Sequence, residues 1–205
     1  MRTGADLKDP MSPPIPTRAG VGAARPYLLD ADGWAHGAQA RPSPNFDARP
    51  PGCRIDLLVV HCISLPPGQF GGGHVERLFA NALDAGAHAY FARLRGMRVS
   101  AHFLVARDAT VVQFVSCNDR AWHAGNSSWE GRASCNDFSI GIEVEGSEFE
   151  RFTPAQYAVL AQLQEALAAA YPIVWTRGHE EIAPGRKTDP GPLFDWTRLW
   201  RDRTR

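Results

Sequence analysis

The apolar positions of the chain fall into short, dense runs that predict strands. Residues 55–60 are almost wholly apolar and lead into His61, which is typical of a strand buried on both faces. Residues 107–110 are mostly polar and separate two further runs, so a hairpin is expected there. In all, strands are predicted at residues 55–60, 100–106, 111–115, 138–144 and 173–176.

Helical periodicity is clearest after Thr153. Pro154 suits the first position of a helix, and Gln156 completes the spacing of a capping box that begins at Thr153. Shorter helices are expected around residues 75–83 and 195–201. The apolar residues that share one face of the long helix are Leu160, Leu163 and Leu167.

Two proline-rich segments help to set the expected bounds of the folded domain. Residues 1–25 combine four prolines with Gly, Ser and Arg, and they are predicted to form a flexible tail. Residues 41–52 are also rich in proline and are expected to run as an extended surface segment into the first strand. With 205 residues in total and 44% hydrophobic content, the chain suits one compact domain over residues 26–205.

Charge balance, cysteine spacing and the lengths of the apolar runs indicate which partners and which cellular compartment to expect. Lys and Arg total 22 and Asp and Glu total 22, so no global field would attract nucleic acid or an anionic membrane. The four cysteines lack the spacing of a disulfide scaffold, and reduced thiols are expected. No apolar run matches a secretory signal or the roughly 20 residues of a spanning helix. We therefore expect a cytoplasmic protein, and the sequence indicates no obligate protein partner.

Three residues are candidates to hold a catalytic zinc ion. Such sites use three imidazole or carboxylate ligands and leave one position open for water. His61 stands where a buried run opens into a Gly- and Pro-rich loop, His179 begins another long loop, and Asp189 precedes a proline that favours extended backbone. Taken singly, a histidine at a strand end is more often structural than a ligand, so spacing alone does not decide the point.

Charged side chains nearby could complete such a site. Lys187 is two residues from Asp189 in an extended segment, so both can project to one side, where the ammonium could stabilise an oxyanion. Arg186 would then point the other way, toward an anionic group of a substrate. Glu143 and Glu145 share one face of their strand, and either could act as general base. By default, each of these is only a solvated charge.

Other motifs are weaker or excluded. His179 and Glu180 begin like the HExxH motif, but Ala183 stands where the second histidine belongs, which excludes a thermolysin-like zinc helix. The aromatic and basic segment 120–125 contains Trp122 and could form a wall for a sugar or peptide. A structural role is expected for the remaining histidines, which are His36, His74, His88, His102 and His123.

Longer motifs are more specific than these single residues. They are Leu58-Val59-Val60-His61, Val99-Ser100-Ala101-His102, Arg120-Ala121-Trp122-His123-Ala124-Gly125, Cys135-Asn136-Asp137-Phe138-Ser139-Ile140-Gly141-Ile142-Glu143 and Ile182-Ala183-Pro184-Gly185-Arg186-Lys187-Thr188-Asp189-Pro190-Gly191-Pro192. Together they resemble the AmpD-type 1,6-anhydro-N-acetylmuramyl-L-alanine amidases over roughly residues 28–202.

The resemblance implies a fold, a cofactor and a reaction. The implied fold is the α/β (α+β) single domain shared with peptidoglycan recognition proteins, in which helices pack on a central mixed sheet beside a zinc cleft. The implied reaction is hydrolysis of the amide bond between the lactyl group of (1,6-anhydro)-N-acetylmuramic acid and L-alanine in muropeptides, during cytoplasmic peptidoglycan recycling. By motif, the ligands of Zn²⁺ would be His61, His179 and Asp189, the catalytic residues Glu143 and Lys187, and the substrate contacts Trp122, Arg98, Arg186, Cys62 and Val144.

Two positions depart from the family pattern. Asn commonly follows the first zinc histidine, and this chain has Cys62, a weaker hydrogen-bonding group. Ser134 replaces an arginine that often precedes the cysteine at 135. Both departures concern the substrate side of the site. Two rival functions are a module that binds peptidoglycan fragments without cleaving them, which would typically lack a zinc ligand, and a lytic amidase that acts on intact cell wall.

Overall fold

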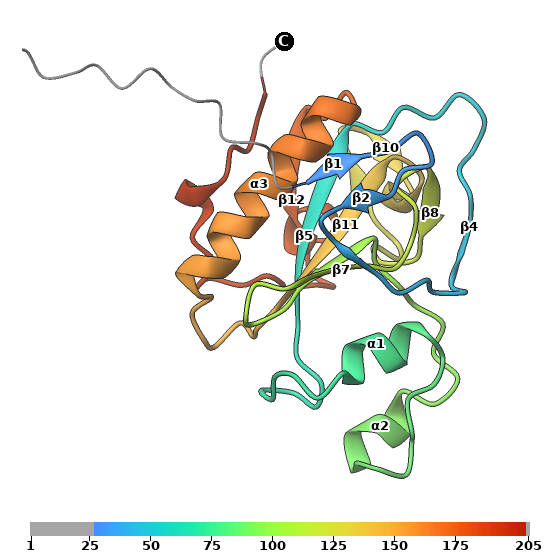
Figure 1. Ribbon diagram of the computed structural model, residues 1–205, viewed down its shortest axis with the longest axis vertical. Helices are drawn as coiled ribbons and strands as arrows, with labels where there is room; N and C mark the ends of the chain where they lie inside the picture. Colours follow the sequence, from blue (N-terminus) through green and yellow to red (C-terminus); the bar gives the residue numbers. More distant parts are fainter. Residues whose placement is uncertain (1–26, 204–205) are drawn as a thin grey trace, which may run out of the picture.

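A mixed sheet of six strands forms the centre of the molecule (Figure 1). The computed structural model describes residues 27–203, so the tail predicted at residues 1–25 lies outside the described residues. The strands, in spatial order, are β12 (Trp175–Gly178), β5 (Leu57–Ile63), β11 (Ser139–Glu145), β6 (Phe103–Val105), β7 (Val111–Gln113) and β3 (Gln39–Ala40). The strands from β12 to β6 are parallel, β7 is antiparallel to β6, and β3 is parallel to β7.

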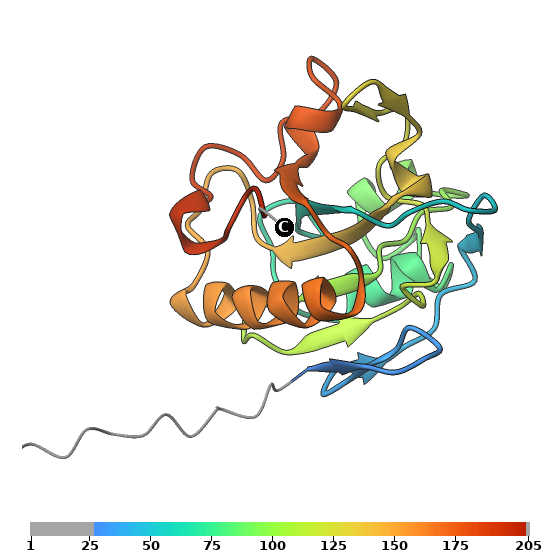
Figure 2. The same ribbon diagram turned by 90° about the horizontal axis from the view of Figure 1, so that it is seen from above.

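Different elements pack against the two faces of the sheet. Figure 2 shows α3 (Pro154–Ala170) lying along one face, while α4 (His179–Ile182) and the loop that follows it lie beyond the other. Strand alternation turns Leu58 and Val60 of β5 toward the core cluster that includes α3, and it turns Leu57 and Val59 toward a second cluster that includes α4. Because both faces are covered here, the sequence of β5 is apolar without alternation.

The start of α3 is fixed by the capping box that the sequence predicts. Oγ1 of Thr153 accepts a hydrogen bond from the backbone N–H of Gln156 at 3.1 Å, and Oε1 of Gln156 accepts one from the backbone N–H of Thr153 at 3.0 Å. The Nε2 group of Gln156 donates to the backbone oxygen of Glu145 at 2.8 Å. The cap therefore also ties α3 to the end of β11. Leu160, Leu163 and Leu167 are buried, as predicted.

The remaining elements are short. α1 (His74–Phe79) and α2 (Ala89–Arg93) lie together at one end of the molecule (Figure 1), where they share an apolar cluster with residues of β6 and β7. The others are β1 (Leu28–Leu29), β2 (Ala35–His36), β4 (Phe46–Ala48), β8 (Asp119–Ala121), β9 (Ser128–Trp129), β10 (Arg132–Ala133) and the 3₁₀ helices η1 (Cys135–Asp137) and η2 (Trp196–Arg198).

Several predicted elements need correction. β5 continues beyond His61, so this histidine lies inside the strand rather than at its end. The segment 41–52 is more than an extended connection, because β4 within it pairs antiparallel with β8. The first helix stops early, since Asn81 just beyond it has a left-handed backbone with φ 58°. Over residues 195–201 only η2 forms.

Two further features concern membrane helices and cysteines. Within residues 27–203, no helix combines the length and the apolar character needed to cross a membrane. All four cysteines lie in this range and are free thiols, as predicted.

Candidate active site

The three candidate metal ligands come from two neighbouring strands and one loop. Gly178 ends β12 opposite Val60 of β5, so His179, the first residue of α4, follows at the level of His61. Asp189 lies in the loop after α4, and its backbone oxygen accepts a hydrogen bond from the backbone N–H of Glu180 at 3.0 Å. This bond folds the loop back onto the start of α4 and brings the carboxylate to the histidines.

The donor atoms of these side chains converge. Nδ1 of His61 is 2.9 Å from Nδ1 of His179, and Oδ2 of Asp189 is 3.2 Å from each. A tetrahedral zinc ion with bonds of about 2.0–2.1 Å holds neighbouring ligand atoms roughly 3.3 Å apart. Two imidazoles and one carboxylate are also a ligand set that catalytic zinc sites use. The residues therefore fit zinc in both spacing and chemistry.

In both candidate ligand histidines, the ring nitrogen that points away from the metal site, Nε2, has a polar contact of its own. Nε2 of His179 lies 3.1 Å from the backbone oxygen of Ala124, and Nε2 of His61 lies 2.9 Å from Nδ1 of His123. Such contacts fix the orientation of a ligand histidine. Here they leave Nδ1 of both rings directed at Asp189.

Burial and hydrogen bonding set the protonation of this group. Burial lowers the pKa of His61 to about 4, so the ring is neutral at physiological pH and keeps a lone pair for a metal. Burial alone would raise the pKa of Asp189, but hydrogen bonds to His179 and His61 outweigh it and hold that pKa below its usual range. The site thus offers two imidazoles and a carboxylate.

Glu143 stands beside the ligands, and one of its oxygens is buried without a hydrogen-bond partner among the described residues. It pairs with His61 in the parallel register of β11 and β5, and both side chains line one cleft. Burial, followed by the charge of Asp189, raises the pKa of Glu143 to about 8 despite the opposing charge of Lys187. Within the part of the chain that the structure describes, Oε2 of Glu143 has no hydrogen-bond partner. A buried oxygen of this kind calls for a partner outside the chain, such as water or substrate.

Glu145 has a different environment, although spacing along the strand did not separate it from Glu143. It is 5% exposed and does not border the cleft. Its Oε1 accepts a hydrogen bond from the backbone N–H of Gly71 at 2.5 Å, and its Oε2 accepts one from the backbone N–H of Arg107 at 2.8 Å. Both carboxylate oxygens of Glu145 are therefore occupied by hydrogen bonds that stabilise the fold.

The two basic residues before Asp189 both border the cleft. For Lys187, this is the placement that its spacing predicts. The prediction that Arg186 points away is wrong, because its Nη2 group donates to the backbone oxygens of Ala124 at 2.6 Å and Asn126 at 2.7 Å. Arg186 thereby holds the same carbonyl group that His179 contacts.

Trp122 and Cys62, which the resemblance implies as substrate contacts, form part of the cleft wall. The cleft has a volume of about 430 Å³ and is bordered by the ligands as well as by these two residues. The backbone N–H of Trp122 donates to Oγ of Ser100 at 3.0 Å. Cys62 is partly buried, and burial raises the pKa of its thiol, which therefore stays protonated.

Two residues that the resemblance implied as substrate contacts lie elsewhere. Val144 is 1% exposed and belongs to the core cluster under α3, because alternation along β11 turns it to the face opposite Glu143. Arg98 is exposed and borders a smaller pocket of about 240 Å³ beside α1 and α2. Its chain neighbours Met97 and Val99 border the cleft instead.

Two further residues of the site were not predicted as such from the sequence. His123 was assigned a structural role, yet it contacts His61. Glu148 borders the cleft and accepts a hydrogen bond from Oγ1 of Thr188. The segment 120–125 carried a signal for the first of these. No local pattern marks the second, whose contact spans 40 residues.

Comparison with known proteins agrees with this site. Residues 51–192 match the family model described as N-acetylmuramoyl-L-alanine amidase, and this range contains all three candidate metal ligands. Since the match covers more than half of the chain, the chain belongs to this family of amidases, and it is an amidase.

Individual relatives are similar over most of their length. The protein named 1,6-anhydro-N-acetylmuramyl-L-alanine amidase AmpD from Citrobacter freundii is 53% identical over 84% of this chain and 92% of its own. The protein of the same name from Escherichia coli (strain K12) is 51% identical over 84% and 95%. A crystal structure of a Se-Met AmpD derivative aligns with a TM-score of 0.80 at 52% identity, covering 84% of this chain and 97% of that chain. The central sheet and its helices therefore form the AmpD fold.

Proposed function

We propose that this amidase hydrolyses the amide bond between the lactyl group of 1,6-anhydro-N-acetylmuramic acid and L-alanine in muropeptides, with Zn²⁺ as its cofactor. The observation that carries the proposal is that a zinc-type ligand triad and the unpartnered oxygen of Glu143 border one cleft. The names of relatives at 51–53% identity support the substrate class. The proposed setting is peptidoglycan recycling in the cytoplasm.

Each residue of the triad and its neighbours has a proposed role. His61, His179 and Asp189 would hold the zinc ion, which when bound supplies a Lewis acid and lowers the pKa of water. Glu143 takes a proton from the attacking water and returns it to the amine of the leaving L-alanine. Lys187 stabilises the negative charge that develops on the carbonyl oxygen.

The environment of Glu143 suits both halves of this task. A group that first accepts and then donates a proton works best when its pKa lies near the working pH. In the metal-free chain, burial raises the pKa of Glu143 to about 8, whereas an exposed glutamate is ionised from about pH 4.3 upward. Trp122, Cys62 and Arg186 border the same cleft and are the proposed substrate contacts.

Removal of the metal tests the cofactor. We expect exhaustive chelation to abolish turnover of a synthetic anhydromuropeptide and stoichiometric Zn²⁺ to restore it. Zinc at 100 times its Kd should also stabilise the fold by about 2.7 kcal/mol, measured as a shift in urea unfolding. Asp189→Ala is the matched control, because it should abolish the restoration. Full turnover after chelation, with no zinc bound, would refute the proposal.

A substrate comparison separates the rival functions. Initial rates are measured on the soluble anhydromuropeptide and on insoluble sacculi at equal concentrations of amide bond. We expect the soluble substrate to be cleaved faster. Faster release from sacculi would instead favour a lytic amidase, and binding of the soluble fragment without cleavage would favour a recognition module.

A further inference from the structure

His123 lies directly behind the candidate metal site. Its Nδ1 is 2.9 Å from Nε2 of His61, and the two rings meet edge to face with centroids 5.0 Å apart and planes at 87°. Ligand histidines usually give their second ring N–H to a carboxylate, a backbone oxygen or water. His179 follows that rule with Ala124. His61 does not, because its partner is another imidazole.

The proton positions of the two rings follow from this contact. His61 can bind a metal through Nδ1 only if that atom carries a lone pair, so the proton of the neutral ring must be on Nε2. This N–H then donates to Nδ1 of His123, which must act as acceptor. The proton of neutral His123 is consequently on its Nε2, which lies 3.3 Å from Oγ of Ser139. Ser139 can accept it, and the tautomers of both rings are thereby fixed.

The ring of His123 packs directly against the backbone of the central sheet. A Cβ atom at position 141 would lie 2.5 Å from ring atoms Cγ and Nδ1 of His123, which is closer than any real contact. Gly141 belongs to β11 and is on the same face of the strand as Glu143. The absence of a side chain at this position is therefore what allows the ring to lie against β11 behind His61.

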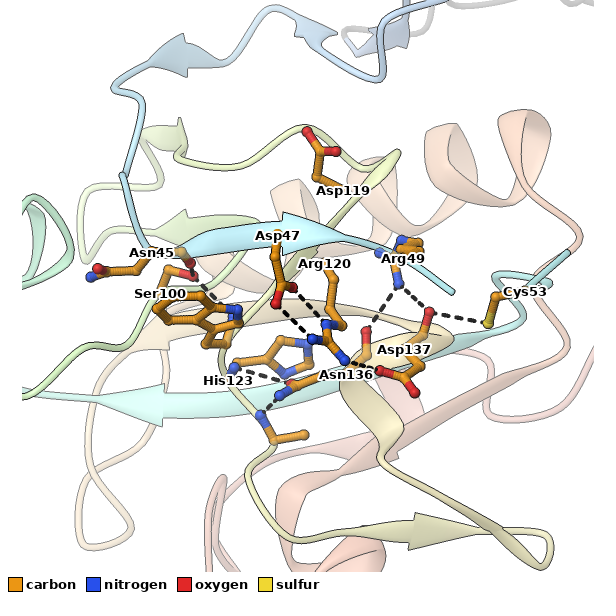
Figure 3. Close-up of polar contacts among 12 residues, drawn as sticks. Asn45, Asp47, Arg49, Cys53, Ser100, Asp119, Arg120, His123, Asn136 and Asp137 are labelled. Atoms are coloured by element: carbon orange, nitrogen blue, oxygen red, sulfur yellow. Dashed lines mark hydrogen bonds and ion pairs between the residues drawn. The ribbon is translucent and has the colours of Figure 1, made fainter. Parts of the chain in front are cut away.

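The backbone of His123 is also held. Oδ1 of Asn136 accepts hydrogen bonds from the backbone N–H groups of His123 at 3.1 Å and Ala124 at 2.8 Å, as Figure 3 shows. Arg49 in turn donates to the backbone oxygen of Asn136 at 3.0 Å. One side chain thus fixes the two residues that contact the far nitrogens of both ligand histidines.

Salt bridges anchor this arrangement to the neighbouring strands. Arg120 bridges Asp47 of β4 and Asp137 of η1, with nitrogen-to-oxygen distances of 2.6 Å to each (Figure 3). The segment that carries His123 follows β8 directly, so the pairing of β4 with β8 keeps it in place.

We propose that His123 is a positioning residue: by accepting the Nε2 proton of His61, it holds that ring in the tautomer and orientation that bind zinc. This inference rests on the proposed zinc site. It does not make His123 a ligand or a catalytic residue, and its effect is on metal affinity first and on turnover only through the metal.

The test measures zinc affinity by competition with a chelating dye. His123→Leu fills a similar volume and removes the acceptor nitrogen. We expect zinc affinity to fall 10- to 100-fold, as is typical when a residue that orients a metal ligand is lost. His123→Asn places an amide oxygen near the former Nδ1 and should recover most of the affinity. Ser139→Ala, which removes only the distal acceptor, should give a smaller loss and covers the case in which the leucine variant does not fold.

The matched control is His102→Asn. His102 is a fully buried histidine whose ring packs edge to face on His123, with centroids 5.7 Å apart, and contacts Arg49 and the backbone of Asp119 and Gly141 but no metal ligand, so this variant disturbs the packing around His123 without removing its acceptor nitrogen. We expect this variant to unfold at lower urea yet bind zinc as wild type does. Equal zinc affinity in wild type and His123→Leu would overturn the inference, and so would equal losses at positions 102 and 123. If wild type itself fails to bind zinc, the proposed function fails instead.

Discussion

Glu143 and Glu145 are the same residue type, on the same face of the same strand, and both are largely withdrawn from water, but their neighbourhoods differ completely. Glu145 lies at the end of β11, where the backbone N–H groups of Gly71 and Arg107 occupy both of its oxygens. Glu143 lies beside His61, and its Oε2 has no partner among the described residues. The carboxylate of Glu145 is occupied by structural hydrogen bonds, and the carboxylate of Glu143 is available for catalysis.

This difference shows why the functional carboxylate cannot be identified from strand position. Burial of a carboxylate is costly unless its oxygens are hydrogen-bonded. At Glu145 the turns at the ends of β5 and β6 meet that need. At Glu143 they do not, and the consequence is a pKa of about 8. The comparison therefore predicts that changes at the two positions separate activity from stability.

The largest expected effect is on turnover, at Glu143. Glu143→Gln keeps the shape of the side chain and removes the proton acceptor, so kcat of the zinc-loaded enzyme should fall by about 10²- to 10⁴-fold. Its zinc affinity and far-UV circular dichroism should stay close to those of wild type. Glu145→Gln is the paired control and should retain turnover per folded molecule within a few-fold. A reversal of these two results would mean that Glu145 is the base.

The second effect is on stability, at Glu145. Glu145→Ala leaves the N–H groups of Gly71 and Arg107 without their charged acceptor, and we expect a loss of about 3 kcal/mol in the free energy of unfolding. Urea denaturation with the matched Glu143→Ala variant measures the contrast. A loss at position 143 as large as that at 145 would contradict the division of roles.

The features that could be predicted from the sequence are those set by residues close together in the chain, and the features that could not are set by distant contacts. Local patterns predicted the strand before His61 and the capping box at Thr153, because propensity and spacing act within a few residues. The family motifs supplied the candidate triad. The partners of Glu145 come from loops 74 and 38 residues away, so no local pattern distinguishes it from Glu143. Likewise α2 is only five residues long and has no clear period of its own.

Residues around the metal ligands were the least predictable for a related reason. Val144 was carried over by motif, but a period of two along β11 turns it into the core. His123 looked like one more structural histidine until the fold placed its ring against Gly141 and His61. In both cases the deciding fact is which surface a neighbouring element covers, and that fact is tertiary.

A third, smaller effect is expected at Gln156, which supports the Glu145 end of β11. Gln156→Ala removes the donor to the backbone oxygen of Glu145 and half of the capping box, and we expect a loss of about 1–2 kcal/mol by urea denaturation. The loss should be smaller than for Glu145→Ala because Gln156 is a neutral side chain whose shortest hydrogen bonds are to neutral backbone groups, and its contact with Arg107 is longer, at 3.3 Å. Turnover per folded molecule should not change. A loss of turnover without a loss of stability would show that this end of β11 also belongs to the active site.

The last effect concerns pH and uses the metal-free protein. The pKa of Glu143 is about 8 in the folded chain and near 4.5 when unperturbed, so between these values the folded state binds one proton more than the unfolded state. The stabilisation from this group is complete below about pH 4.5 and is lost as the pH rises through about 8. In Glu143→Gln that pH dependence is absent, while all other groups are unchanged. The difference in unfolding free energy, wild type minus Glu143→Gln, should therefore decrease from pH 5 to pH 8 in the presence of a chelator. A difference that stays constant over this range would show that the Glu143 carboxyl is as well solvated as an ordinary surface glutamate, and the contrast with Glu145 would then rest on hydrogen bonding alone.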